Sequence, residues 1–423
     1  MRTNRGLTGR RSSSGPGRTD GGRGNARMSL LIFNAGSSTL KCSLTDATGE
    51  QTFARAVVDR SSRPATYVWD AEGKPPVQEA GEWSEPRLAV ERIVESARAL
   101  IDASPHAGAI ETVSHRVVHG GSRFTGAVVV DASVRAALAE VSALAPLHNP
   151  PSLHVIDAAM KALPNVPHVA VFDTAFHATL APEAYTYALP FEWSARWGLR
   201  RFGFHGLSHA YCANRAAELA GRASEGFRVI VAHLGNGASV SAVDSGRSVA
   251  TTMGFTPVEG LMMGTRSGSV DPGLLMHLMI GCGVPADELQ HTLNYSSGLL
   301  GVSGLSADMR AVLRAAKADH ERAALAVSMF VDRARQAIGA LAVTLGQVDA
   351  LVFTAGIGEH SAEIRAAICN GLECLGLELD AEVNASARPD ARLSPPDSRG
   401  IILVVRTRED LMMARAAFAC TAT

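Results

Sequence analysis

The sequence predicts an α/β protein built from two similar domains, and three observations carry this prediction. An apolar β-run, a small polar glycine loop and an alternating strand form the stretch "SLLIFNAGSSTLKCSLTDATGE", which begins at Ser29. The same order recurs as "FRVIVAHLGNGASVSAVDSGRS", which begins at Phe227. Stretches with apolar residues three and four apart, typical of helices, lie between such β-runs. A β-run pattern that occurs once in each half of a mixed sequence indicates two similar α/β domains.

Two further β-runs complete the expected sheets. "HVAVFDTAFH" ends its apolar run at Asp173, and "DALVFTAGIGEHS" runs from Asp349 into another glycine loop. The expected helices are "ASVRAALAEVSALA", "SLHVIDAAMKAL", "HAYCANRAAELAG" and "HERAALAVSMFVDRARQAIGALAVTLG". A last helix is expected from "TREDLMMARAAF", with Thr407 as its N-cap and Asp410 completing a weak capping box.

Composition excludes several classes of protein. The 423 residues are 46% hydrophobic and 19% charged, and 40 Lys and Arg nearly balance 41 Asp and Glu. This balance does not favour a nucleic-acid partner or a basic membrane-surface protein, and no apolar run reaches the ~20 residues of a membrane helix. The six cysteines fit no zinc or redox spacing, so we expect reduced thiols and a cytoplasmic protein.

The first 27 residues are rich in Arg, Gly and Ser and offer almost nothing to bury. We expect this segment to be disordered. A transit peptide would need an amphipathic apolar face, and a nucleic-acid-binding tail remains an alternative. A start at Met28, with an upstream start codon or a cloning remnant before it, is the favoured interpretation.

The glycine loops indicate phosphate binding, because backbone N–H groups reach phosphate oxygens only where no Cβ intervenes. Neither loop of the repeat runs into a helix, so both are expected to be hairpin loops rather than Walker A loops. The G-x-G fragments lack the third glycine of a dinucleotide fingerprint. The residues expected to supply donors or charge are Ser37, Ser38, Thr39, Lys41, Gly235, Asn236 and Gly237.

Two arginines stand among small or apolar neighbours, Arg116 in "HRVVHGGSRF" and Arg266 in "MGTRSGS". Arginine keeps its charge and is almost never fully buried without a partner. We expect each guanidinium to hold an anion, with a salt bridge between the domains as the structural alternative.

Taken together, the motifs resemble those of the short-chain carboxylate kinase family. The resemblance runs from about Ser29 to the last helix, and its motifs are "FNAGSSTLK", "SHRVVHGG", "LAPLHNPP", "VFDTAFH", "FGFHGLSH", "AHLGNGAS", "MGFTPVEGLMMGTRSGSVDP", "GVSGLSAD" and "FTAGIGE". It implies two actin-like ATPase (ribonuclease H-like) domains with the nucleotide in the cleft between them. The implied division is a tail at 1–27, an N-terminal domain at 28–175 completed by a helix at 409–420, and a nucleotide-binding domain at 176–408.

The implied reaction is direct, in-line and reversible transfer of a phosphoryl group from ATP to acetate, giving acetyl phosphate and ADP. The resemblance implies Mg²⁺, or Mn²⁺ in its place, and a homodimer, with no nucleic-acid or membrane partner. The residues given catalytic roles by resemblance are Arg116, Asp173, His205, Arg266 and His148. Because a carboxylate substrate is already ionised, Asp173 is expected to align an arginine or act near the metal rather than serve as a base. His115 and His119 are expected to be core residues.

The remaining site residues also follow from the resemblance. The substrate methyl group is expected against Val118, Leu147, Phe204 and Pro257, and the metal at Asn34 and Glu409. The nucleotide is expected against Lys41, His233, Leu234, Gly235, Asn236, Gly237, Asp308, Met309, Arg310, Gly356, Ile357, Gly358, His360 and Ile364. The chain has Arg408-Glu409-Asp410 where the family commonly has Asn-Glu-Glu, so Arg408 is expected to weaken metal binding or to point to solvent.

Two alternatives remain open. Valine at position 118 favours acetate, but one methylene contributes only ~1–3 kcal/mol of discrimination, so a propionate or butyrate kinase is the nearest alternative. An actin- or Hsp70-like ATPase is the alternative of a different class, although it has no use for a methyl pocket beside two arginines.

Overall fold

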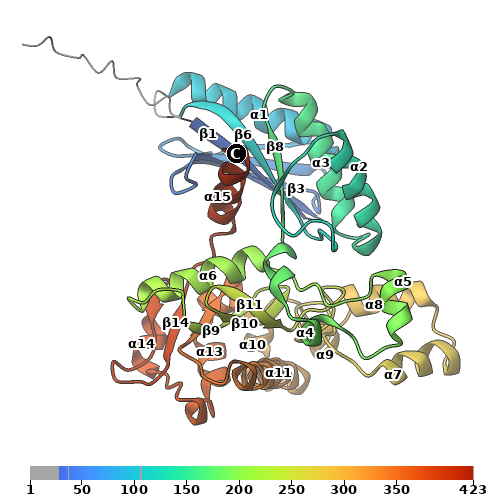
Figure 1. Cartoon of the computed structure of the whole chain (residues 1–423), viewed down its shortest axis with the longest axis vertical. Helices are drawn as coiled ribbons and strands as arrows, with labels where there is room; N and C mark the ends of the chain where they lie inside the picture. The colour runs from blue at the N-terminus through green and yellow to red at the C-terminus, as the bar shows by residue number, and fades with distance from the viewer. Residues whose placement is uncertain (1–27, 37, 105–106, 423) are drawn as a thin grey trace, which may run out of the picture.

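The computed structural model describes residues 28–36, 38–104 and 107–422. Two β-sheets, one from each half of the chain, form the centres of two lobes that lie one above the other in Figure 1. The prediction of disorder for residues 1–27 and the prediction for Ser37 lie outside the described residues.

The first sheet has the strand order β5-β4-β3-β2-β1-β6-β8-β7. Its strands are β1 (Met28–Ala35), β2 (Thr39–Asp46), β3 (Thr52–Asp59), β4 (Ala65–Ala71), β5 (Val77–Gly81), β6 (Ala109–Val117), β7 (Val128–Val129) and β8 (His168–Phe172). The helices of this half are α1 (Pro86–Ala103), α2 (Ala132–Val141), the 3₁₀ turn η1 (Ser142–Leu144) and α3 (Asn149–Ala162). Helices α1 and α3 cover one face, where Leu31 and Phe33 of β1 point.

The second sheet has the strand order β11-β10-β9-β12-β14-β13. Its strands are β9 (Arg228–Leu234), β10 (Ala238–Asp244), β11 (Arg247–Thr251), β12 (Ala350–Thr354), β13 (Ala391–Arg392) and β14 (Ile401–Val404). Helices α6 (Gly206–Leu219) and α11 (Glu321–Leu345) cover its two faces. The alternation in β9 explains this, because Val229 and Val231 face α6 while Ile230 and Ala232 face α11.

The remaining helices lie mainly around the second sheet, except the last one, which packs on the first sheet. They are η2 (Ala175–Thr179), α4 (Pro182–Tyr185), α5 (Phe191–Trp197), α7 (Pro272–Met276), the π-helical turn η3 (His277–Gly281), α8 (Ala286–Tyr295), α9 (Gly298–Ser303), α10 (Met309–Lys317), α12 (Ala355–His360), α13 (Ala362–Cys369), η4 (Glu373–Leu375), α14 (Ala381–Ser386) and α15 (Glu409–Thr421). Among the described residues, no helix combines the length and the apolar character that crossing a membrane requires.

The predicted internal repeat is confirmed by the strand pairing. In the first sheet β1 pairs antiparallel with β2 and parallel with β6, and β6 pairs parallel with β8. In the second sheet β9 pairs antiparallel with β10 and parallel with β12, and β12 pairs parallel with β14. The orders β3-β2-β1-β6-β8 and β11-β10-β9-β12-β14 are therefore equivalent, and both glycine loops of the repeat join hairpin strands as predicted.

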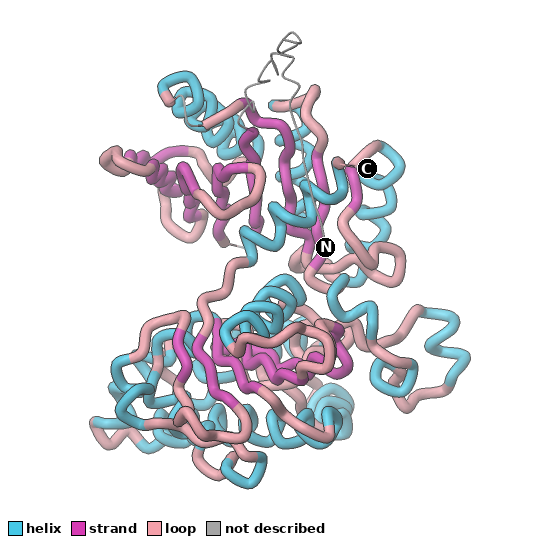
Figure 2. The backbone as a smooth tube through the Cα atoms, turned by 60° about the vertical axis from the view of Figure 1, so that its left-hand side comes forward, coloured by secondary structure: helices cyan, strands magenta, loops and turns pink. Residues whose placement is uncertain are grey.

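The last helix, α15, returns to the first sheet. Figure 2 shows it leaving the lower lobe through an extended segment and lying along the strands of the upper lobe. Its Met413 and Ala414 pack against Leu30 and Ile32, on the face opposite α1 and α3. The predicted capping was wrong: the helix begins at Glu409 without a side-chain cap, because the Thr407 hydroxyl instead donates to Ser208 Oγ at 2.9 Å.

Candidate active site

Arg116 is held in place by its own lobe. It lies near the end of β6, opposite Asn34 of the neighbouring β1. Its Nε and Nη2 atoms donate to the two oxygens of Asp173 at 2.8 and 2.6 Å, and its Nη1 lies 3.2 Å from Asn34 Oδ1 and 3.3 Å from Glu409 Oε2. Burial alone would lower the pKa of Arg116, but these two carboxylates outweigh it and raise the pKa. The guanidinium is thus fixed in one orientation before any ligand arrives.

Asp173 lies directly after β8 and is almost completely buried. Both of its carboxylate oxygens accept from Arg116, and its backbone oxygen accepts from the Gly206 amide at 3.0 Å. A side chain at Gly206 would collide with this oxygen, so glycine allows the first lobe to approach the start of α6. This arrangement agrees with Asp173 aligning an arginine, which was one of its two expected roles.

Arg266 has a different environment. Its Nη2 lies 3.2 Å from Nε2 of His148, which comes from the other lobe, and its Nη1 donates weakly to the Pro257 carbonyl at 3.4 Å. Within the described part of the chain no carboxylate pairs with it. Burial lowers the pKa of Arg266, as expected for a desolvated cation without a counterion. The alternative of a salt bridge between the lobes therefore does not hold for this arginine.

Three histidines lie beside these arginines. Burial lowers the pKa of His148 and of His233, to about 4 and about 3, and holds that of His205 well below its ordinary value, so all three are neutral at pH 7. The His205 and His233 rings stack, with their centroids 4.2 Å apart. His205 has a left-handed backbone with φ of 56°, a strained conformation at the start of α6 that aims its ring at β10.

His115 and His119 were expected to be core residues, and both side chains are buried. His115 stacks on Phe33 and shares a hydrogen bond with His168 at 3.0 Å. His119 accepts from the Gly121 amide at 2.9 Å.

The glycine hairpin between β9 and β10 lies against the cluster. A Cβ atom at Gly237 would come within 3.3 Å of both Arg266 Nη1 and His205 Nε2. The absence of side chains at Gly235 and Gly237 leaves the loop backbone beside Arg266 and the histidines, as a phosphate site requires.

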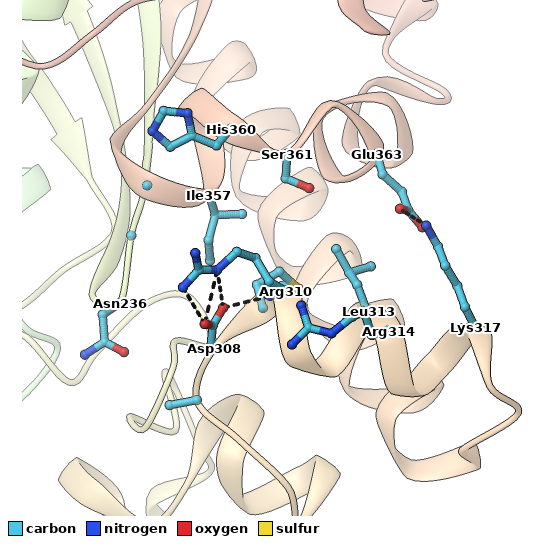
Figure 3. A pocket seen from close by; sticks show the side chains of 14 residues that line it. Asn236, Asp308, Arg310, Leu313, Arg314, Lys317, Ile357, His360, Ser361 and Glu363 are labelled. Carbon is cyan, nitrogen blue, oxygen red and sulfur yellow. Dashed lines mark hydrogen bonds and ion pairs between the residues drawn. The ribbon is translucent and has the colours of Figure 1, made fainter.

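A cavity of about 860 Å³ opens beside this hairpin, and Figure 3 shows its lining. This volume lies within the usual range of ligand pockets. Eight predicted nucleotide residues line it: Gly235, Asn236, Asp308, Met309, Arg310, Gly356, Ile357 and His360. Asp308 caps α10 by accepting from the Arg310 amide, and it also pairs with the Arg310 guanidinium at 2.7 Å.

The other predicted nucleotide residues lie outside this cavity. Leu234 and Ile364 are completely buried in the core, and Gly358 lies within α12 on its side toward β9 and β12. His233 and Gly237 lie at the histidine cluster, and Lys41 lies in the first lobe beside Asn34 and Asp410. Their nucleotide contacts stay predictions.

Sequence reasoning missed one wall of the cavity. Leu313, Arg314 and Lys317 project from α10, and Figure 3 shows Lys317 meeting Glu363 at its rim, an ion pair of 2.6 Å. These positions follow Arg310 at three-, four- and seven-residue spacing, so they share its face on α10. This spacing was the signal available in the sequence.

The predicted methyl pocket is only partly assembled. Leu147 and Pro257 line a cavity of about 320 Å³ together with His148. Val118 and Phe204 instead pack in the hydrophobic core of the second lobe, and Phe204 is 1% exposed. The structure thus brings two of the four apolar residues to one cavity.

The predicted metal residues, Asn34 and Glu409, converge on Arg116 from two elements. Burial raises the pKa of Glu409, and Asp173 and Asp410 raise it further, against the opposing effects of Arg116 and Lys41. No group of three or more His, Cys, Asp or Glu side chains in the described ranges is arranged to hold a metal ion. The donors nevertheless fit Mg²⁺, which prefers hard oxygen ligands and takes few from the protein, keeping waters and phosphate oxygens for the rest.

The Arg408 side chain is bonded within the first lobe, so it neither points freely to solvent nor faces Arg116 and Arg266. Its Nε donates to Asp410 Oδ1 at 3.0 Å and its Nη2 to the Gly49 carbonyl at 2.8 Å. It therefore fastens the start of α15 to the turn between β2 and β3.

Two copies of one sheet pattern, each with a hairpin phosphate loop, define the actin-like ATPase (ribonuclease H-like) fold. The arginines and neutral histidines where the lobes meet place the protein among the phosphotransferases of that fold.

Comparison with known proteins identifies the family. Residues 29–415 match the model of the Acetokinase family. An acetate kinase of Cyanothece sp. is 43% identical over 408 residues, which cover 92% of this chain and 97% of that protein. The crystal structure of Porphyromonas gingivalis acetate kinase is similar with a TM-score of 0.86 and 38% identity, covering 93% of this chain and 100% of that chain. A structure titled as a propionate kinase from Francisella tularensis has a TM-score of 0.83 and 34% identity, covering 92% and 98%. The chain belongs to the acetokinase family and is a phosphotransferase with a carboxyl group as acceptor.

Proposed function

We propose that the protein is an acetate kinase that transfers the γ-phosphoryl group of ATP to acetate, giving acetyl phosphate and ADP. The observation that carries this proposal is Arg266, a partly buried guanidinium without a carboxylate partner in the described residues, beside the glycine hairpin. An acetate oxygen forms the new bond to phosphorus while the bond to the β-phosphate oxygen breaks, and ADP leaves with that electron pair. Acetate is already an anion, so no proton has to be removed.

The chief obstacle to this reaction is repulsion between two anions. Arg266 would hold acetate and the transferring phosphoryl group, since its free donors suit oxygen anions. Arg116, held by Asp173, Asn34 and Glu409, would present its guanidinium in a fixed orientation from the opposite lobe. The neutral imidazoles of His148, His205 and His233 would offer N–H donors without adding charge.

The nucleotide would occupy the 860 Å³ cavity, with its phosphates directed along the glycine hairpin toward Arg266. The exposed His360 and the α10 side chains then surround the base and ribose. The preferred metal would be Mg²⁺, with Mn²⁺ as a substitute, held at Asn34 and Glu409. When bound it would neutralise phosphate charge, which is the chemistry that such an ion supplies to phosphoryl transfer.

Acetate is the preferred acceptor in this proposal. The 320 Å³ cavity lined by Leu147 and Pro257 is the feature that favours longer acids. If the Leu147 side chain moved aside, a larger alkyl group could enter this cavity. We therefore expect measurable turnover of propionate, below that of acetate.

The test is an assay of ATP with acetate, propionate and butyrate, in which acyl phosphate is trapped as hydroxamate. Acetyl hydroxamate formed faster than the propionyl product supports the proposal. The reverse order indicates a propionate kinase, and ATP hydrolysis without hydroxamate indicates an actin- or Hsp70-like ATPase.

We also propose the domain division 28–175 with α15, and 176–408, and a homodimer in the cytoplasm. Phe191 of α5 and Ile280 of η3 are 75% and 81% exposed, and Trp193, Trp197 and Met276 are about half exposed. Exposed apolar side chains on such a scale suit contact with a second copy. Light scattering of the wild type and of Phe191→Glu/Ile280→Glu tests this, and a monomeric wild type would contradict it.

A further inference from the structure

The stacked histidines His205 and His233 both present Nε2 to the glycine hairpin. A Cβ at Gly237 would lie 3.3 Å from His205 Nε2, and one at Gly235 would lie 3.6 Å from His233 Nε2. A neutral imidazole carries one proton, so Nε2 can donate to a phosphoryl oxygen only if the ring is unprotonated at Nδ1. Something in the protein must select that tautomer.

Ser239 of β10 is placed to make the selection for His205. Its Oγ lies 2.9 Å from Nδ1 of His205 and 2.7 Å from Nε2 of His209. A hydroxyl has one proton, and the two rings are the only hydrogen-bond partners of this hydroxyl among the described residues, so Ser239 donates to one ring and accepts from the other. Two arrangements of the protons on His205, Ser239 and His209 are therefore possible.

The second ring nitrogen of His209, Nδ1, distinguishes these two arrangements. His209 is completely buried, and its Nδ1 has no hydrogen-bond partner among the described residues. If Ser239 donated to His209, the neutral His209 ring would carry its proton on Nδ1 and bury an N–H group without an acceptor. Buried N–H groups without an acceptor are rarer than buried acceptors without a donor. The state in which Nδ1 carries no proton is therefore favoured. His209 Nε2 then donates to Ser239, and Ser239 donates to His205 Nδ1.

We propose that Ser239 is a positioning residue, which relays the orientation set by His209 and fixes His205 as the tautomer protonated at Nε2. This inference rests on the proposed function, since it gives His205 an N–H donor directed at the transferring phosphoryl group. His233 has an equivalent arrangement: the Thr407 hydroxyl donates to Ser208 Oγ at 2.9 Å, and Ser208 Oγ lies 2.8 Å from His233 Nδ1. Two serines thus set two parallel donors toward one loop.

Ser241 provides a matched control. It lies two residues further along β10, is also completely buried, and bonds to Thr251 Oγ1 at 2.8 Å, away from the histidines. Ser239→Ala and Ser241→Ala each remove one buried hydroxyl from the same face of one strand. A purely structural role would make the two variants alike.

The experiment combines spectroscopy and kinetics on the full chain. In protein labelled with ¹⁵N-histidine, with His205→Gln used only to assign the resonance, we expect the His205 signal of the wild type to be protonated at Nε2 and bare at Nδ1. In Ser239→Ala this pattern should change, and kcat should fall ~10–100-fold, as for other partners that orient a histidine, with the KM values for ATP and acetate within about twofold. Ser241→Ala should keep the wild-type His205 signal and most of kcat.

Two results would overturn the inference. One is a wild-type His205 protonated at Nδ1, which can be observed even if Ser239→Ala does not fold. The other is a kcat loss in Ser239→Ala no larger than in Ser241→Ala. Failure of the proposed function is distinguishable, because the wild type would then form no acyl hydroxamate while its His205 tautomer could still be read.

Discussion

Replacing Arg266 by alanine should abolish most turnover while leaving the fold intact. The fold should survive because Arg266 makes only one weak bond to a carbonyl and one contact to a neutral imidazole, so its removal leaves no described carboxylate unpaired. Its pKa is lowered by burial, which means that desolvating its charge costs free energy. The free energy of unfolding should therefore change by less than about 1 kcal/mol.

The loss of turnover can be worked from the contacts available. The guanidinium can make two charge-assisted bonds to the transition state, each contributing about 1.5–3 kcal/mol. Together they correspond to about 3–6 kcal/mol, or a ~10²–10⁴-fold decrease in kcat/KM. Hydroxamate trapping measures the rate, and urea unfolding of the same preparation measures stability.

Arg266→Lys is the matched control, because it keeps the charge and loses the planar fork. We expect it to recover part of the rate and to remain well below the wild type. Near-normal turnover in Arg266→Ala, or a loss explained by unfolding, would refute the assigned role.

Three further predictions concern stability. Arg116→Ala leaves the buried Asp173 and the partly buried Glu409 without their arginine partner and should lower the free energy of unfolding by about 3–5 kcal/mol in urea titrations, unlike Arg266→Ala; equal effects would contradict the assigned pairing. Arg408→Ala removes bonds to Asp410 and the Gly49 carbonyl, so α15 should lose protection from hydrogen exchange, and unchanged exchange would show that these bonds do not hold the helix. Burial lowers the pKa of His177 from 6.5 to about 4, so the unfolded chain binds more protons between these pH values and stability should fall as pH drops through this window. His177 contributes up to about 1.4 kcal/mol per pH unit, and His177→Gln should flatten the measured slope; an unchanged slope would contradict its burial as a neutral group.

The fold was predictable because its signals are local. The β-run, glycine loop and alternating strand after Ser29 and after Phe227 specify the two hairpins directly, and their repetition predicted two similar domains, which the equivalent strand orders of the two sheets confirm. Alternation in β9 also fixes which residues face α6 and which face α11. Period-two and three-to-four-residue patterns record such burial one element at a time.

The partners within the site were less predictable, because they come from distant parts of the chain. Arg116 and Asp173 are 57 residues apart, and Thr407 reaches Ser208 over 199 residues. The second contact explains the wrong N-cap at Thr407: its hydroxyl has a tertiary partner that no local pattern reveals. Ser239 carries no sequence signal of its own, since a serine in an alternating strand is ordinary.

The two arginines have different electrostatic roles, and the sequence alone does not reveal this difference. Arg116 is already neutralised by Asp173 and by Glu409, so it offers fixed geometry rather than free charge. Arg266 lacks such a partner in the described part of the chain, and its desolvated charge is stabilised only when an anion arrives. Substrate binding should therefore relieve the cost of desolvating Arg266, which links affinity for the anions to the stability of the folded protein. This division explains why one guanidinium can be rigid while the other remains available to acetate and phosphate.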